Sequence, residues 1–99
     1  MGTYNISNFE WDEAKRQANL AKHGIDFAMA SIVFANRVLA AEDRRRDYGE
    51  RRYCGLGLLQ DRVVFVVFTL QGDDTCRVIS LRRANRREQN AYESRASAY

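Results

Sequence analysis

The sequence contains no proline, and it shows no internal repeat or low-complexity tract. Proline-rich linkers and repeat architectures are therefore excluded, and a length of 99 residues suits one small domain with a single core, which we assign to residues 1–99. No apolar run approaches the roughly 18 residues that a membrane-spanning helix needs, and the first residues lack the basic and apolar segments of a secretory signal. The sequence therefore predicts a cytoplasmic protein with no membrane-bound part.

Cysteine and histidine are also scarce. Cys54 and Cys76 do not have the spacing of metal ligands, and His23 is the only histidine that could join them. The sequence therefore predicts neither a metal site nor a cofactor. It also predicts that both cysteines are free thiols, because an unpaired cysteine packs as a small core residue.

Positive charge is in modest excess, but it is concentrated in two segments. The formal net charge is +3, and arginine outnumbers lysine by 14 to 2. Residues 77–95 contain six arginines against two acidic residues, and residues 42–53 contain five against four. Because the planar guanidinium fork suits phosphate oxygens better than an ammonium group does, these segments are candidates for binding nucleic acid. A solvated surface rich in salt bridges is the alternative interpretation.

Local signals predict two helices in the first third of the chain. Asp12 is a good N-cap and Gly24 a good C-terminal stop, so the first helix ends near His23. Apolar residues recur at spacings of three and four and define one face of this helix: Trp11, Ala14, Ala18 and Ala21. Asp26 can then cap a second helix that ends around Asn36.

Runs of β-branched and aromatic residues predict four strands after this point, at residues 38–43, 51–59, 63–70 and 75–83. The third run is apolar enough to predict burial on both faces. Asn85 and Glu88 then form a capping-box-like start for a C-terminal helix. A short edge strand at residues 8–11 is an additional possibility. This order predicts an α+β fold with an N-terminal helical hairpin, a largely antiparallel four-stranded sheet and a C-terminal helix.

Charged side chains on these strands are candidates for catalysis. Because side chains alternate across a strand, Glu50 and Arg52 are expected to share one face. In the last strand, the same alternation groups a second set of residues on one face: Cys76, Val78, Ser80 and Arg82. If the register aligns the two faces, Glu50, Arg52 and Arg82 surround a single phosphate.

Such a trio suits RNA cleavage by internal attack of the 2′-hydroxyl group, which needs a proton acceptor, stabilisation of phosphate charge and a proton donor, but no metal. Glu50 is the candidate base, with Arg52 and Arg82 as phosphate clamps and a histidine or tyrosine as proton donor. Surface Glu–Arg pairs are also common as purely structural contacts. His23 is similarly open to two interpretations, because a protonated imidazole at a helix C-terminus is stabilised by the helix dipole without any catalytic role. Lys22 beside it can contact either the last helical carbonyls or a substrate phosphate.

Three segments resemble the BrnT toxins of bacterial type II toxin–antitoxin systems. They are FEWDEAKRQANLAKHGIDF at residues 9–27, DRRRDYGERRYCGLG at residues 43–57, and VVFVVFTLQGDDTCRVISLRRANRREQNAY at residues 63–92. Each of the KHGI helix end, the YGE-x-R turn and the VISLRRA strand is short, but their combination in this order is specific.

The resemblance implies a RelE-like fold and a metal-independent endoribonuclease that inhibits translation. It also implies neutralisation by a BrnA-type antitoxin, a toxin homodimer within a heterotetramer, and contact with operator DNA only through that complex. The catalytic residues carried over by the motifs are Lys22, His23, Glu50, Arg52 and Arg82. The resemblance makes Arg77, Arg83 and Arg86 secondary RNA-binding residues.

Two other functions remain compatible with the residues alone. A non-catalytic module could use the same arginines to bind a nucleic acid backbone, with an affinity that falls as salt rises. A protein-interaction domain could instead use them to bind an acidic partner.

Overall fold

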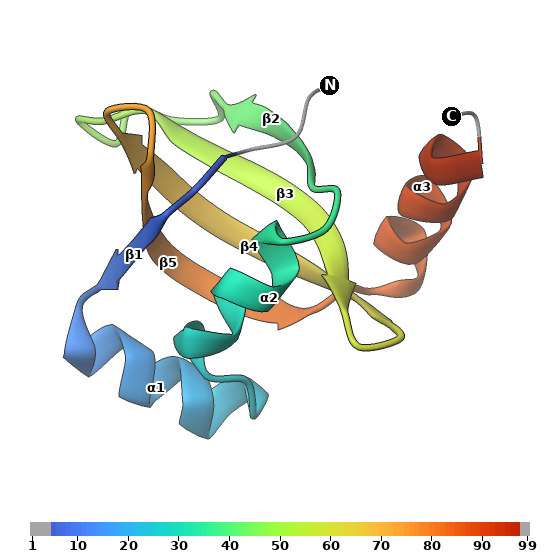
Figure 1. Cartoon of the computed structure of the whole chain (residues 1–99), viewed down its shortest axis with the longest axis horizontal. Coiled ribbons are helices and arrows are strands. Elements are labelled where there is room, and N and C mark those ends of the chain that lie inside the picture. Colours follow the sequence, from blue (N-terminus) through green and yellow to red (C-terminus); the bar gives the residue numbers. More distant parts are fainter. Residues whose placement is uncertain (1–4, 98–99) are drawn as a thin grey trace.

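The sheet of the computed structural model, which describes residues 5–97, contains five strands in the order β1-β5-β4-β3-β2 (Figure 1). The strands are β1 (Asn8–Trp11), β2 (Leu39–Asp43), β3 (Arg52–Leu59), β4 (Arg62–Gln71) and β5 (Thr75–Arg83). β1 is parallel to β5, and the other neighbours are antiparallel. The predicted α+β class is confirmed. The sheet is nevertheless five-stranded and mixed, rather than four-stranded and largely antiparallel, because residues 8–11 do form an edge strand.

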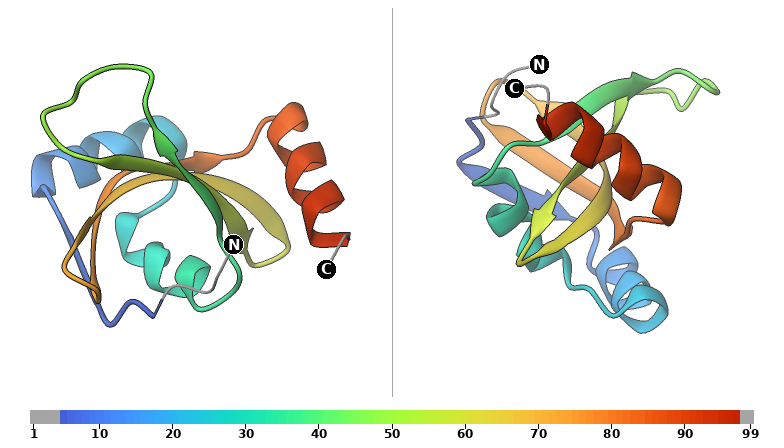
Figure 2. Two further views of the ribbon diagram at one scale, coloured as in Figure 1. Left: turned by 90° about the horizontal axis from the view of Figure 1, so that it is seen from above. Right: turned by 90° about the vertical axis from the view of Figure 1, so that its right-hand side faces the viewer.

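Helical segments of the described chain flank this sheet. They are α1 (Glu13–His23), the 3₁₀ turn η1 (Phe27–Met29), α2 (Ala30–Phe34) and α3 (Arg86–Ser97). Figure 2 shows α2 on one face of the sheet, the loop between β2 and β3 projecting from the other side, and α3 beside one end. The second helix of the predicted hairpin is therefore split into a 3₁₀ turn and a short α-helix. No helix within residues 5–97 has the length and apolar character needed to span a membrane.

The predicted ends of α1 are confirmed. The Asp12 side chain accepts hydrogen bonds from the N–H groups of Ala14 and Lys15. Gly24 adopts a φ of 72°, a conformation that favours glycine, and donates its N–H to the carbonyl of Leu20. His23 is therefore the last residue of the helix, as the sequence predicts.

The side chain of Asn19 forms hydrogen bonds with the backbone of β5 where no other described strand pairs with that edge of the sheet. β1 pairs with β5 only between Thr75 and Val78, so the rest of β5 has no strand on that side. There the Asn19 amide donates to the carbonyl of Leu81 at 2.7 Å, accepts from the Leu81 N–H at 3.2 Å, and also donates to the carbonyl of Ile25. The alanines of the predicted apolar face are exposed: Ala14, Ala18 and Ala21. α1 is therefore anchored by a buried amide and not by those alanines.

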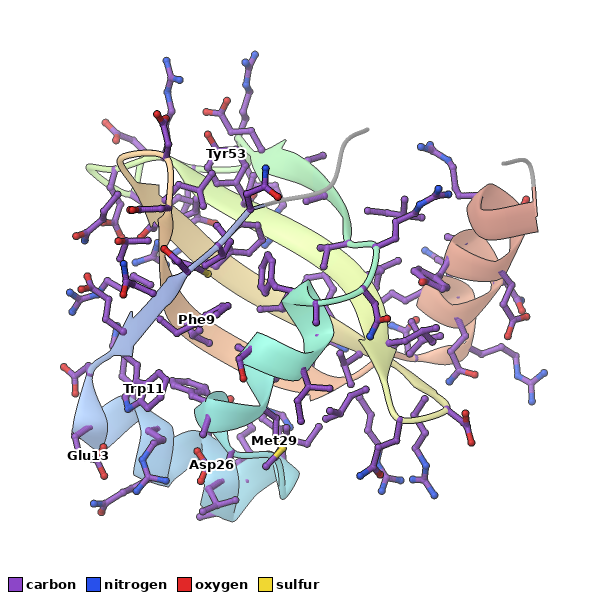
Figure 3. The ribbon with its side chains drawn as sticks, in the orientation of Figure 1. Phe9, Trp11, Glu13, Asp26, Met29 and Tyr53 are labelled. Atoms are coloured by element: carbon purple, nitrogen blue, oxygen red, sulfur yellow. The ribbon has the colours of Figure 1, made fainter. Side chains whose placement is uncertain are left out.

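The core lies between the sheet and the helical segments η1 and α2. In Figure 3, Phe9 and Trp11 of β1 point towards these helices, where their ring centroids lie 5.8 Å from Phe34 and 6.4 Å from Phe27. One side of β4 is fully buried in this core: Val64, Val66 and Phe68. The other side is only half-buried: Val63, Phe65 and Val67. The prediction that this segment is buried on both faces is therefore wrong, because the outer side is only partly covered.

Two glycines of β3 allow the segments around α2 to approach the sheet. A Cβ atom added to Gly57 would lie 2.7 Å from Cγ1 of Val33, and one added to Gly55 would lie 2.9 Å from Cγ1 of Val38. Both separations are shorter than real Cβ contacts allow. The two glycines are therefore required by close packing and not by a turn.

A β-bulge in β5 changes which residues share a face. Val67 pairs with Ser80 and Phe68 pairs with Val78, so Ile79 is an extra residue on the β5 side. The sequence predicted one face that includes Cys76, Val78, Ser80 and Arg82. In the structure the first two are buried in the core, whereas Ser80 and Arg82 follow the bulge and point to the opposite side.

α3 starts with the predicted capping box. The Asn85 side chain accepts a hydrogen bond from the N–H of Glu88 at 2.8 Å, and the Glu88 carboxylate accepts one from the N–H of Asn85 at 2.9 Å. Tyr92 is buried. The capping box therefore fixes the first turn of α3 directly after β5.

Candidate functional site

The face of the sheet opposite η1 and α2, here called the outer face, carries most of the charged strand residues. Antiparallel partners point to the same side, so the paired residues Asp43 and Arg52 share this face. On the far side of β5, Arg77 pairs with Glu10 of β1. Because of the bulge, Arg77 and Arg82 both lie on the outer face although they are five positions apart along the strand.

One row of polar residues crosses the outer face. Tyr53 pairs with Phe68, so the next residues along these strands, Arg52 and Thr69, lie side by side. Thr69 pairs in turn with Arg77. The row, here called the polar row, consists of Asp43, Arg52, Thr69, Arg77 and Glu10. Thr69 is 4% exposed, and its hydroxyl oxygen has no hydrogen-bond partner within residues 5–97.

Asp43 organises the loop at one end of the polar row. Its carboxylate accepts from the backbone N–H and the guanidinium of Arg45 and from the hydroxyl of Tyr48 at 2.9 Å, and it lies 3.7 Å from the Sγ of Cys54. The guanidinium of Arg45 is the main reason why the pKa of Asp43 lies well below its usual value. The side chain of Asp43 is only 4% exposed, so it is a structural centre of the loop.

Glu50 and Arg52 lie together beside this loop, as the sequence predicts. The Nε of Arg52 donates to Oε2 of Glu50 at 3.3 Å, and its guanidinium carbon lies 4.4 Å from the ring centroid of Tyr48. This stacking holds the arginine, since a guanidinium is attracted to the face of an aromatic ring. Glu50 is about half exposed, so its carboxylate is accessible to a substrate.

Arg82 is held at the other end of the outer face. Its two terminal nitrogens donate to the two carboxylate oxygens of Glu88, both at 2.9 Å, and its guanidinium carbon lies 4.2 Å from the ring centroid of Phe65. The hydrogen bond from Arg82 is the largest cause of the lowered pKa of Glu88, so this glutamate is ionised at neutral pH.

Arg52 and Arg82 share the outer face but do not meet. Arg82 pairs with Phe65, which pairs with Leu56, four residues from Arg52 on β3. With a spacing of about 4.8 Å between strands and about 3.3 Å per residue, their Cα atoms are roughly 16 Å apart. The structure therefore brings Glu50 and Arg52 together and places Arg82 near Glu88 instead. Their guanidinium groups are also held by different partners, Glu50 for Arg52 and Glu88 for Arg82.

Lys22 and His23 lie near the bulge. Together with Lys15, they line a shallow hollow that also includes Ile79 and Ser80. The end of α1 is therefore next to the strand that carries Arg77 and Arg82. The lysines of this hollow, Lys15 and Lys22, add positive charge at the edge of the sheet next to β5.

The three secondary arginines have different surroundings. Arg77 lies in the polar row, 3.9 Å from Glu10. Arg83 is exposed and lines a hollow with Asp61 and Arg62, and Arg86 is exposed at the start of α3. Of the three, only Arg77 lies in the polar row that also contains Arg52.

An apolar groove of about 240 Å³ lies between α3 and the outer face. Its lining includes Leu39, Cys54, Leu56, Phe65, Ala91 and Arg95.

Both cysteines are free, as predicted, and burial raises the pKa of Cys76 to about 12 and that of Cys54 above its usual value. Neither thiol is therefore activated as a nucleophile.

Four residues that shape this site were not among the predicted site residues, although Glu88 was predicted to cap α3: Asp43, Tyr48, Thr69 and Glu88. Asp43 and Glu88 carry local signals, because acidic residues near arginines in a turn or at a helix start form hydrogen bonds there. Thr69 and the position of Tyr48 depend on strand register and on loop packing, for which the sequence contains no local signal. In the described part of the chain, no group of three or more His, Cys, Asp or Glu side chains is arranged to hold a metal ion.

Comparison with known proteins supplies independent information. The family described as "Ribonuclease toxin, BrnT, of type II toxin-antitoxin system" matches residues 11–88. The chain is also similar to the 1.1 Å crystal structure of the Brucella abortus ribonuclease toxin BrnT, with 31% sequence identity, a TM-score of 0.59, and coverage of 81% of this chain and 100% of that chain. No curated protein matches the chain. The fold of this chain is thus similar to that of BrnT. Its sheet differs from the expected RelE-like, four-stranded arrangement in the added parallel strand β1.

Proposed function

This chain belongs to the BrnT family of ribonuclease toxins of type II toxin–antitoxin systems, and from that premise we propose that it is an endoribonuclease that cleaves RNA through its outer face. The observation that carries the proposal is a set of arginines on this face whose N–H groups are not all used by carboxylates within residues 5–97: Arg52, Arg77 and Arg82. Free guanidinium edges of this kind are suited to phosphate oxygens.

The proposed reaction is internal attack by the 2′-hydroxyl group. Glu50 accepts the proton of this hydroxyl, O2′ bonds to phosphorus, and the bond from phosphorus to O5′ breaks. The products are a 2′,3′-cyclic phosphate and a 5′-hydroxyl end. Arg52, held beside Glu50 and stacked on Tyr48, stabilises the charge that develops on the phosphate.

The remaining predicted residues are assigned to the rest of the RNA chain. Because the Cα atoms of Arg82 and Arg52 are roughly 16 Å apart by strand geometry and Glu88 holds the Arg82 guanidinium, we assign Arg82 to a neighbouring phosphate and not to the one being cleaved. Arg83 and Arg86 extend this positive surface. His23 and Lys22 lie at the edge of the sheet beside Ser80 of β5, so we assign them to phosphates beyond the one being cleaved. Tyr48, whose ring stacks against Arg52, is the candidate donor of the proton to O5′.

Membership of a type II family implies an antitoxin partner. We propose that this partner is of the BrnA type, that the toxin is a homodimer within a heterotetramer, and that operator DNA is contacted only through that complex. Cleavage of RNA in the cytoplasm would inhibit translation.

The test is cleavage of a defined RNA by the purified protein in EDTA, with Glu50→Gln and Arg82→Ala as variants. We expect the wild-type protein to cleave without added metal. Loss of the general base in Glu50→Gln should lower the cleavage rate about 100-fold. Arg82→Ala should mainly weaken binding.

Matched controls separate these effects from changes in charge. Asp61→Asn and Arg87→Ala remove the same charges at exposed positions away from Glu50 and Arg52, and both should cleave like the wild type. Circular dichroism checks that every variant is folded. Equal cleavage by wild type, Glu50→Gln and Arg82→Ala would refute the assignment, and RNA that is bound but left intact would favour a non-catalytic module.

A further inference from the structure

The guanidinium of Arg82 is fixed by some of its N–H groups and leaves others available. Arginine has five N–H donors. Nη1 donates to the carbonyl of Arg83 at 3.0 Å and to Oε1 of Glu88, and Nη2 donates to Oε2 of Glu88. Within residues 5–97, the remaining two N–H groups of Arg82, on Nε and Nη2, have no acceptor.

These two N–H groups point in the same direction. The Nε–H and the outer Nη2–H of a guanidinium are parallel, and they form one of the forks that bind two oxygens of a phosphate. Glu88 occupies the other fork, at the end of the side chain. The carboxylate therefore holds the arginine without blocking its Nε edge.

Two other arginines show the opposite arrangement. Arg45 uses its Nε and Nη2 to bind the carboxylate of Asp43, and Arg16 uses the same edge to bind Glu13. Their Nε edges are filled by carboxylates of this chain, so both arginines are structural. Arg82 differs because its carboxylate partner, Glu88, binds the fork formed by Nη1 and Nη2 at the end of the side chain.

Glu88 also connects Arg82 to the first turn of α3. The oxygen that accepts from Nη1 of Arg82 accepts from the backbone N–H of Asn85 as well. The ring of Phe65 limits the guanidinium from the side of the sheet. The orientation of Arg82 is thus determined by the start of α3 and by β4 together.

We infer that Glu88 is a positioning residue that holds the Nε edge of Arg82 towards a phosphate of the RNA. The inference rests on the proposed function, because it assigns a substrate phosphate to that edge. Glu88 itself does not touch the RNA. Its effect on binding is exerted through Arg82.

The test measures binding of a short RNA in which every 2′-hydroxyl is methylated, so that it cannot be cleaved. In one of its two amide orientations Glu88→Gln retains an acceptor for the Asn85 N–H, but in either orientation the amide nitrogen faces an N–H donor of Arg82. We expect the Kd to rise about five- to tenfold, although the variant is more positive. Simple charge repulsion between Glu88 and RNA predicts the opposite change, tighter binding.

A double-mutant cycle tests whether Glu88 acts through Arg82. Arg82→Ala should weaken binding, and adding Glu88→Gln to it should cause no further loss, because the positioned group is already absent. Additive losses would overturn the inference, and so would wild-type or tighter binding by Glu88→Gln.

Asn85→Ala is the matched control for helix capping. It removes the other half of the capping box but keeps the carboxylate that binds Arg82. We expect a lower melting temperature and a Kd within twofold of the wild-type value, and a loss equal to that of Glu88→Gln would overturn the inference. Failure of the proposed function is distinguishable, because the wild-type protein would then leave ordinary RNA intact, a result that does not depend on Glu88.

Discussion

An arginine binds a phosphate only with N–H groups that no neighbouring carboxylate already occupies. This criterion separates the arginines of the present chain better than their exposure does. Arg45 is highly exposed, yet its Nε edge is filled by Asp43. Arg82 is less exposed and has the same edge unoccupied among the described residues. Sequence alone identifies arginine-rich segments but not these differences, because they depend on which carboxylate each side chain reaches.

Asn19 provides a stability prediction at the residue scale. Replacing it with alanine leaves the Leu81 N–H and the carbonyls of Leu81 and Ile25 without their partner in a buried place. We expect Asn19→Ala to lower the free energy of unfolding by about 3 kcal/mol, as measured by urea denaturation. Gln17→Ala, at an exposed position of the same helix, should change it by less than about 0.5 kcal/mol. Similar values for both variants would show that the amide contacts contribute little.

Elements were predictable wherever their signals are local. The caps at Asp12, Gly24 and Asn85 are in the predicted positions because each depends on a few adjacent residues. The bulge at Ile79 was not predictable, because an extra residue in a strand is defined only by the partner strand. It moves Arg82 to a different face from Cys76, and the arrangement of the candidate site depends on it.

At the scale of elements, the contact between β3 and α2 can be tested at Gly57. Gly57→Ala places a methyl group 2.7 Å from Cγ1 of Val33, so the atoms at this contact must shift. We expect a loss of about 1–3 kcal/mol in the free energy of unfolding. The double variant Val33→Ala/Gly57→Ala should lose less than the sum of the two single variants, because the smaller side chain makes room. Additive losses in urea denaturation would contradict this packing.

For the whole molecule, the candidate site combines residues from distant parts of the chain. Its outer face collects residues from β1 to β5, the loop that contains Tyr48 and the start of α3. The sequence could predict the class of each segment but not the separation of Arg52 from Arg82, because this distance is a property of strand order and register. Strand alternation and family resemblance together supplied the candidate residues, and the structure showed which of them lie together.

Acid stability is a prediction for the whole molecule. Arg16 lowers the pKa of Glu13 to about 2, and hydrogen bonds also lower the pKa values of Asp26, Asp43 and Glu88. In the unfolded chain such groups take up protons at about pH 4, whereas the folded protein keeps them ionised. Stability should therefore be fully present above about pH 5 and fall as the pH decreases from about 5 towards 2.

Urea denaturation at a series of pH values measures this effect. Asp43→Asn should be less stable than the wild type at neutral pH, yet lose less stability between about pH 5 and pH 3. Asp61→Asn, at an exposed turn, should retain the wild-type pH dependence. If Asp43→Asn also follows the wild-type pH dependence, Asp43 does not contribute to acid sensitivity.

The Asn19 amide at Leu81 has a consequence for how copies of the chain behave towards one another. An uncovered strand edge can accept a strand from another molecule, which is a common route to aggregation. β1 covers only the first part of this edge, and at Leu81 a single side chain from α1 occupies the backbone groups that an incoming strand would use. Asn19 thereby blocks intermolecular strand addition at that position without requiring a sixth strand.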